Sequence, residues 1–129
     1  MDLLSERSAG VLLHVSSLPG RYGMGTMGAE ARAFIDFLAG AGFRCWQVLP
    51  LVQTGFGDSP YQSVYGASGN PCFIDPELLA EEGLLHRREL AALRAPAGPV
   101  DFDFVRATRL PMLRKAFSRF DRSDPCLLY

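Results

Sequence analysis

The stretch "GVLLHVSSLPGRYGMGTMGAEARAFIDFLAGAGFRCWQVLPL", residues 10–51, decides the fold class of this chain. It begins with a continuously apolar run at residues 10–15, which is typical of a strand covered on both faces in a parallel sheet. Beyond Ala29 the apolar side chains recur with helical spacing, at Phe34, Phe37, Leu38 and Ala41. Two glycines mark the end of this helix, Gly40 and Gly42. A second apolar run at residues 45–49 completes a strand–helix–strand pattern, which predicts a βαβ unit and an α/β fold.

Two loops follow the predicted strands at their carboxyl ends. They are "HVSSLPGRYG" at residues 14–23 and "QTGFGDSPYQSVYGASGNP" at residues 53–71. Because the carboxyl ends of parallel strands meet at one edge, we expect both loops on the same rim, where ligands of α/β folds bind. The second loop contains "GDSPYQ", residues 57–62, and we predict that it is functional.

The second half of the chain is helical in pattern. Asp75 precedes Pro76 and an apolar run, which predicts a short capped helix. The segment "APAGPVDFDF" has the composition of a break between helices, and a last helix is expected over residues 106–120, starting or kinked at Pro111. Basic residues near this helix predict a solvated face: Arg106, Arg109, Arg114, Lys115, Arg119 and Arg122.

Composition excludes several classes of protein. The chain is 48% hydrophobic and 21% charged, a globular balance, and its net charge of -1 gives no support for nucleic acid or an anionic membrane as partner. Neither a signal peptide nor an apolar run of about 18 residues is present, so we expect a cytoplasmic protein. Three widely spaced cysteines, Cys45, Cys72 and Cys126, indicate buried thiols in a reducing compartment. We expect no metal and no cofactor, since "GRYGMG" lacks the spacing of a nucleotide loop.

Four pieces of the sequence carry a resemblance to a known family. "LLHVSSLPG", "WQVLPL", "GDSPYQS" and "GNP" occur in the order and spacing of the amylomaltases, the 4-α-glucanotransferases or disproportionating enzymes of glycoside hydrolase family 77. The chain resembles their N-terminal part over residues 7–120. The resemblance implies a (β/α)8 TIM barrel that transfers an α-1,4-glucan segment, by a retaining mechanism, to the 4-hydroxyl of glucose or another glucan.

The resemblance also implies that the chemistry lies outside this chain. A barrel of this type takes about 250 residues, so residues 1–129 are expected to be the N-terminal part of one catalytic barrel, with a helical insertion and incomplete. The family's catalytic acids lie on later strands, and we expect no catalytic residue here. Three hypotheses stay open: a part of a 4-α-glucanotransferase, a glucan-binding module without catalysis, and an inactive remnant.

Substrate binding is what the resemblance implies for this chain, with maltooligosaccharides, α-1,4-glucans and glucose as partners. The ring of Tyr61 is expected to pack on the sugar next to the scissile bond, because a flat amphipathic ring suits the face of a pyranose. Ser59 is expected to bind a sugar hydroxyl or hold the loop. Asp58 and Gln62 are further candidates, and Asp58 has turn formation as its alternative role. His14 either points into the site or is a structural histidine.

Two other aromatic residues receive different expectations. Trp46 alternates with Gln47 on the second strand, and we expect Trp46 in the core. Phe56 stands where the family frequently has a tyrosine, so no hydroxyl contact is expected at that position.

Overall fold

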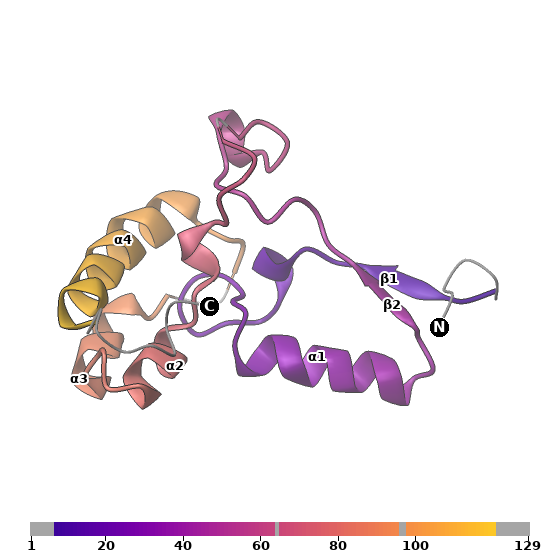
Figure 1. The fold of residues 1–129 in the computed structure, drawn as a ribbon, viewed down its shortest axis with the longest axis horizontal. Helices are drawn as coiled ribbons and strands as arrows, with labels where there is room; N and C mark the ends of the chain where they lie inside the picture. Colours follow the sequence, from indigo (N-terminus) through magenta and orange to yellow (C-terminus); the bar gives the residue numbers. More distant parts are fainter. Residues whose placement is uncertain (1–6, 64, 96–97, 121–129) are drawn as a thin grey trace.

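The N-terminal half of the protein is a βαβ unit. The computed structural model describes residues 7–63, 65–95 and 98–120. Strand β1 (Gly10–Leu12) pairs in parallel with β2 (Cys45–Gln47), and helix α1 (Ala29–Gly40) connects them and runs alongside (Figure 1). Val11 lies opposite Trp46 in the register. The predicted strand–helix–strand unit with parallel pairing is therefore confirmed.

Helix α1 packs on the strand pair through a narrow row of side chains. Ala31 and Leu38 are buried, and the half-buried ring of Phe34 meets Trp46 edge to face at 5.1 Å between centroids. Phe37 is 65% exposed and only stacks beside Phe34, so the predicted apolar face was too wide. Residues spaced by three and four along the helix line up over β2, whereas Phe37 is turned outward.

The expectation of a strand covered on both faces was wrong for the described chain. Val11 and Trp46 are half-buried on the side of α1, but the alternate residues point to the open side, and Leu12 is 58% exposed. Cys45 is on this open side and its thiol is exposed, whereas Cys72 is buried as predicted. Cys126 lies outside the described residues. The reason is the pleat: one helix covers one face of two strands.

The first strand is also shorter than predicted. The Leu13 N–H still donates to the Gln47 carbonyl at 3.0 Å. The pairing with β2 then ends, and the chain forms a 3₁₀ turn, η1 (Val15–Ser17). Within it Ser17 N–H donates to the His14 carbonyl at 2.9 Å. The chain thus leaves the sheet as soon as it reaches the carboxyl end of β1.

The other half is a group of short helices around α4, at the opposite end of the molecule (Figure 1). These elements are η3 (Pro71–Phe73), α2 (Pro76–Glu81), α3 (Arg87–Leu90), η4 (Ala91–Leu93) and α4 (Phe102–Arg119). Helix α4 begins four residues before the predicted start, because the Asp101 carboxylate accepts the Phe104 N–H at 2.9 Å and caps it. It continues through Pro111.

Two apolar clusters are joined by α4. The first contains Val15, Leu18 and Val105, and the second contains Tyr22, Leu85 and Met112. Because Val105 and Met112 are on the same helix, α4 ties the βαβ half to the helical half. No helix in the described part of the chain is long and apolar enough to cross a membrane.

Asp75 caps α2 and also contacts the loop before α1. Its Oδ1 accepts the Glu77 and Leu78 N–H groups at 2.8 and 3.1 Å, as predicted, and its Oδ2 accepts the Thr26 hydroxyl. Asp75→Ala is expected to lower the free energy of unfolding by about 1 to 2 kcal/mol, since cap and hydroxyl partner are both lost. Asp75→Asn keeps an acceptor for the cap and is the matched control. Thermal unfolding followed by circular dichroism measures both, and an Asp75→Ala protein that melts like the parent would contradict this role.

Candidate functional site

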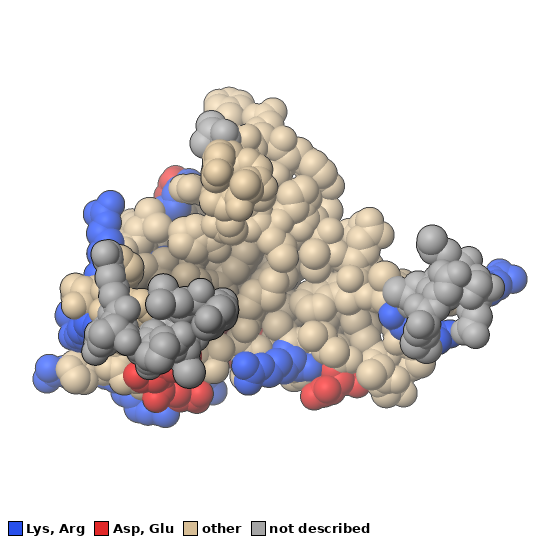
Figure 2. All heavy atoms as spheres, in the orientation of Figure 1, with Lys and Arg blue, Asp and Glu red and all other residues tan. Residues whose placement is uncertain are grey.

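The candidate site is a loop that leaves the body after β2 and returns before η3. Its base is closed by an antiparallel bridge between Val52 and Gly69 and by the Asn70 N–H, which donates to the Leu51 carbonyl at 2.8 Å. Asn70 also accepts the Cys72 N–H at 3.0 Å through its side chain. The loop projects from the body in Figure 1, and in Figure 2 the lobe it forms is mostly free of charged side chains. Its two ends are therefore held together at the base.

Tight turns organise the "GDSPYQ" segment. The first is η2 (Phe56–Asp58), in which the Asp58 N–H donates to the Gly55 carbonyl at 3.2 Å. The Ser59 carbonyl accepts the Gln62 N–H at 3.3 Å and the Gly55 N–H at 3.4 Å. The Ser59 hydroxyl oxygen accepts the Tyr61 N–H at 3.3 Å, so Ser59 holds the turn that carries Tyr61.

Tyr61 is presented to the solvent by this turn. Its side chain is 71% exposed, although it is large and amphipathic. Two more loop aromatics are exposed, Phe56 at 90% and Tyr65 at 64%. The sequence reasoning singled out only Tyr61. Flanking glycines and serines are the signal that could have indicated exposure of the other two.

Asp58 contacts helix α4 through an ion pair with the guanidinium of Arg106. Arg106 also donates from Nη2 to Asp103 at 2.6 Å, one turn earlier. The bond to Asp58, followed by that to Asp103, raises the pKa of Arg106 above its ordinary value. Arg106 is therefore not simply part of a solvated face. A direct contact between Asp58 and a sugar stays a prediction, as does that of Gln62, whose side chain is exposed.

His14 contacts the first apolar cluster through Phe73. Its ring meets Phe73 edge to face at 5.4 Å, and burial lowers the pKa of His14. The Nδ1 atom is buried without a hydrogen-bond partner among the described residues. Asp58, Ser59, Tyr61 and Gln62 thus lie in one turn, and no hydrogen bond or ring contact of the described residues joins His14 to them.

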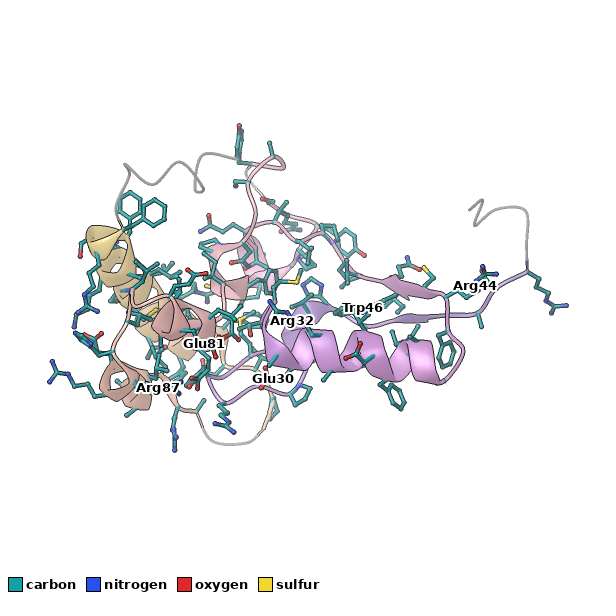
Figure 3. The ribbon with its side chains drawn as sticks, turned by 60° about the horizontal axis from the view of Figure 1, so that its bottom comes forward. Glu30, Arg32, Arg44, Trp46, Glu81 and Arg87 are labelled. Atoms are coloured by element: carbon teal, nitrogen blue, oxygen red, sulfur yellow. The ribbon has the colours of Figure 1, made fainter. Side chains whose placement is uncertain are left out.

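Trp46 belongs to the core, as predicted. Its indole N–H donates to the Leu13 carbonyl at 2.7 Å and its ring packs on Phe34. Figure 3 shows it between β2 and α1. It is unavailable as a platform for a sugar in this arrangement.

Apart from the loop, a hollow of about 260 Å³ lies where the start of α1 meets α2. Glu30, Glu81 and Arg87 contribute to its walls, and Figure 3 shows them in the same region. One of its carboxylates, Glu77, accepts the Tyr22 hydroxyl and lies 3.6 Å from Arg87. Sequence spacing did not predict that these acids converge. Among the described residues, no group of His, Cys, Asp and Glu side chains could hold a metal ion.

Comparison with known proteins decides the family. The family described as 4-alpha-glucanotransferase matches residues 13–126. The chain belongs to the 4-alpha-glucanotransferase family. The match includes both predicted rim loops, and it confirms the resemblance carried by the four sequence motifs.

Individual members of the 4-alpha-glucanotransferase family are similar over nearly the whole chain. The 4-alpha-glucanotransferase of Thermus thermophilus is 49% identical over 120 residues, which are 92% of this chain and 23% of that protein. The Streptococcus pneumoniae TIGR4 protein is 45% identical over 119 residues, 91% of this chain and 24% of its own length. The structure of the Streptococcus agalactiae amylomaltase in complex with acarbose superimposes with a TM-score of 0.84 at 44% identity, covering 89% of this chain and 24% of that one. This chain therefore spans about a quarter of the relatives it matches.

Proposed function

We propose that this chain forms one wall of the glucan site of a 4-α-glucanotransferase. In this proposal residues 1–129 are the N-terminal part of a single (β/α)8 barrel with a helical insertion. The barrel moves a segment of an α-1,4-glucan or maltooligosaccharide to the 4-hydroxyl of glucose or another glucan, with retention. The parallel βαβ unit, the family membership and the position of the "GDSPYQ" loop after β2 support it.

The exposure of the Tyr61 ring is the observation that supports the proposal most. A tyrosine that is 71% exposed on a loop with internal backbone bonds can offer its ring face to the C–H groups of a pyranose. Ser59, already an acceptor in the turn, has a hydroxyl proton to donate to a sugar oxygen. Gln62 is the adjacent amide on the same turn, and His14 is proposed as a more distant wall of the site.

The cutting and joining of the glucan is assigned to acids that this chain does not supply. A retaining mechanism needs two carboxyl groups about 5 Å apart, one to attack carbon and one to move a proton. On the loop itself, the one described carboxylate is Asp58, and it is engaged by Arg106. We therefore propose that this chain binds and orients the glucan.

A chimera tests the proposed function. In it, this chain replaces the matching N-terminal quarter of the Thermus thermophilus 4-alpha-glucanotransferase. The chimera is expected to disproportionate maltotriose with release of glucose, and the 129-residue chain alone is expected to release none. A folded chimera without transfer would contradict the assignment, and one that still binds maltoheptaose would favour a glucan-binding module. Glucose release by the isolated chain would contradict the assignment of the chemistry elsewhere.

Tyr61→Ala in the chimera is expected to weaken binding of maltoheptaose about tenfold, because one ring face no longer covers apolar sugar surface. Tyr61→Phe keeps the ring and is expected to bind within about twofold of the parent. Titration calorimetry with maltoheptaose measures both variants. Equal affinities of the parent and Tyr61→Ala would remove Tyr61 from the site.

A further inference from the structure

We propose that Arg106 is a positioning residue for the sugar-binding loop, acting through Asp58 on Tyr61. The inference rests on the proposed function for its sugar, and on the geometry of the ion pair for the rest. Arg106 comes from α4, a helix that follows the loop in sequence, and it contacts Asp58 across 48 positions of the chain. The pair connects the tip of the loop to a part of the protein that does not carry the sugar residues.

Among the described residues, backbone hydrogen bonds join the loop to the body only near its base. The Val52–Gly69 bridge and the Asn70 N–H hold its base. Beyond the base, the bonds given above for Gly55, Asp58, Ser59 and Gln62 are internal to the turn, so they shape it without fixing its direction. A second contact at Asp58 removes the freedom to rotate about the base.

Helix α4 is a firm support for this contact. Val105 and Arg109, on either side of Arg106, are each 1% exposed, so this turn of the helix is fixed in the core. The Asp103 carboxylate accepts from Nη2 of Arg106 while Nη1 faces Asp58. The guanidinium is therefore oriented from its own helix before it meets the loop, which lowers the conformational freedom lost in the ion pair.

The backbone of Asp58 supplies the second observation. Asp58 has a φ of 57°, in the left-handed region that Asp and Asn adopt more readily than other residues with a Cβ, and it follows Gly57 with a φ of 64°. The two consecutive left-handed residues turn the chain sharply just before Ser59. Ser59 comes next and accepts the Tyr61 N–H, so the orientation of Asp58 is passed to the Tyr61 ring through two residues.

Asp58→Asn and Arg106→Gln test the proposal in the 129-residue chain. Asparagine also tolerates the left-handed conformation, so Asp58→Asn removes the charge and keeps the turn residue. NMR measures the solvent exchange of the Asp58 and Gln62 amide protons. In each variant we expect this exchange to be about 2- to 5-fold faster, because a partly exposed ion pair contributes only a small free energy. In the chimera, each substitution is expected to lower maltoheptaose affinity by a similar factor of about 2 to 5. The unfolding midpoint of the 129-residue chain is expected to stay unchanged. The double variant is expected to show no faster exchange and no weaker binding than either single variant.

Three controls separate this role from a general effect on structure. Arg114→Gln changes an exposed arginine on the same helix and should leave amide exchange and affinity unchanged. Arg106→Lys keeps the positive charge, so it should keep part of the slow amide exchange of the parent at low salt. This protection should be lost near about 1 M salt, where exposed charges are screened. Asp103→Asn should have the smaller effect, because the contact with Asp58 remains.

Unchanged exchange in Arg106→Gln, or additive effects of the two substitutions, would overturn the proposal. A parent chimera that binds no maltoheptaose, with exchange still faster in both variants of the 129-residue chain, would overturn the proposed function and with it the sugar-positioning role. In that case the ion pair would remain as a contact that orders the loop only. The two failures are therefore distinguishable.

Discussion

Replacing Arg109 by methionine is expected to lower the free energy of unfolding by about 3 to 5 kcal/mol. The side chain is 1% exposed and donates to three carbonyls, those of Cys72, Ile74 and Tyr22, at 2.9, 3.0 and 3.0 Å. Methionine fills similar space but donates nothing, and each buried carbonyl left without a partner costs about 1 to 3 kcal/mol. The expected loss is smaller than the sum of the three carbonyl penalties, because the segments that carry these carbonyls can relax.

Charge alone does not replace Arg109. Burial lowers the pKa of Arg109, while the nearby carboxylate of Asp75 acts in the opposite direction. Arg109→Lys is expected to recover only part of the stability, since one ammonium does not span the fork of a guanidinium. Arg114→Met, exposed on the same helix, is the matched control and is expected to stay within about 0.5 kcal/mol of the parent. Urea unfolding followed by circular dichroism compares them, and equal midpoints for Arg109→Met and Arg114→Met would refute the role.

Replacing Gly55 by alanine is expected to reduce maltotriose transfer by the chimera about 100-fold, the scale associated with displacing a positioned group by about 1 Å. A Cβ on Gly55 would lie 1.9 Å from the Gln62 carbonyl oxygen, a backbone atom. The turn from Gly55 to Gln62 would have to open, and the Tyr61 ring would move with it.

Gly66→Ala is the control for Gly55→Ala. It lies in the same loop, and an added Cβ there meets no atom within 4 Å. Its transfer rate is expected to stay within about twofold of the parent. Initial rates of glucose release, measured with circular dichroism as a check of folding, separate the two. Similar rates for both alanine variants would show that the turn does not need its close approach at Gly55.

The elements that could be predicted from the sequence are those set by local spacing. The helical period after Ala29 and the glycines after it predicted α1, and the residue types of Asp75 and Pro76 predicted the cap of α2. The start of α4 was missed although its cap, Asp101, was present, because the segment "APAGPVDFDF" has the composition of a break between helices. Local pattern is a weaker guide where two readings fit the same few residues.

The contacts that organise the candidate site could not be predicted in this way. Arg106 and Asp58 are 48 positions apart, and Arg109 and Tyr22 are 87 apart. Both arginines were expected on a solvated face, because a helical pattern shows which residues share a face but not what lies against it. Tyr61, Ser59, Asp58 and Gln62 were selected through the family resemblance, and their roles toward a sugar stay proposals.

The packing of Trp46 gives the protein an optical probe. Trp46 is the single tryptophan of the sequence, and its surroundings are made by Leu13 before η1, Phe34 on α1 and its own strand β2. Its fluorescence therefore reports on the docking of α1 against the strand pair and on little else. Compared with the circular dichroism of the helices, it can distinguish loss of the βαβ unit from loss of the helical half.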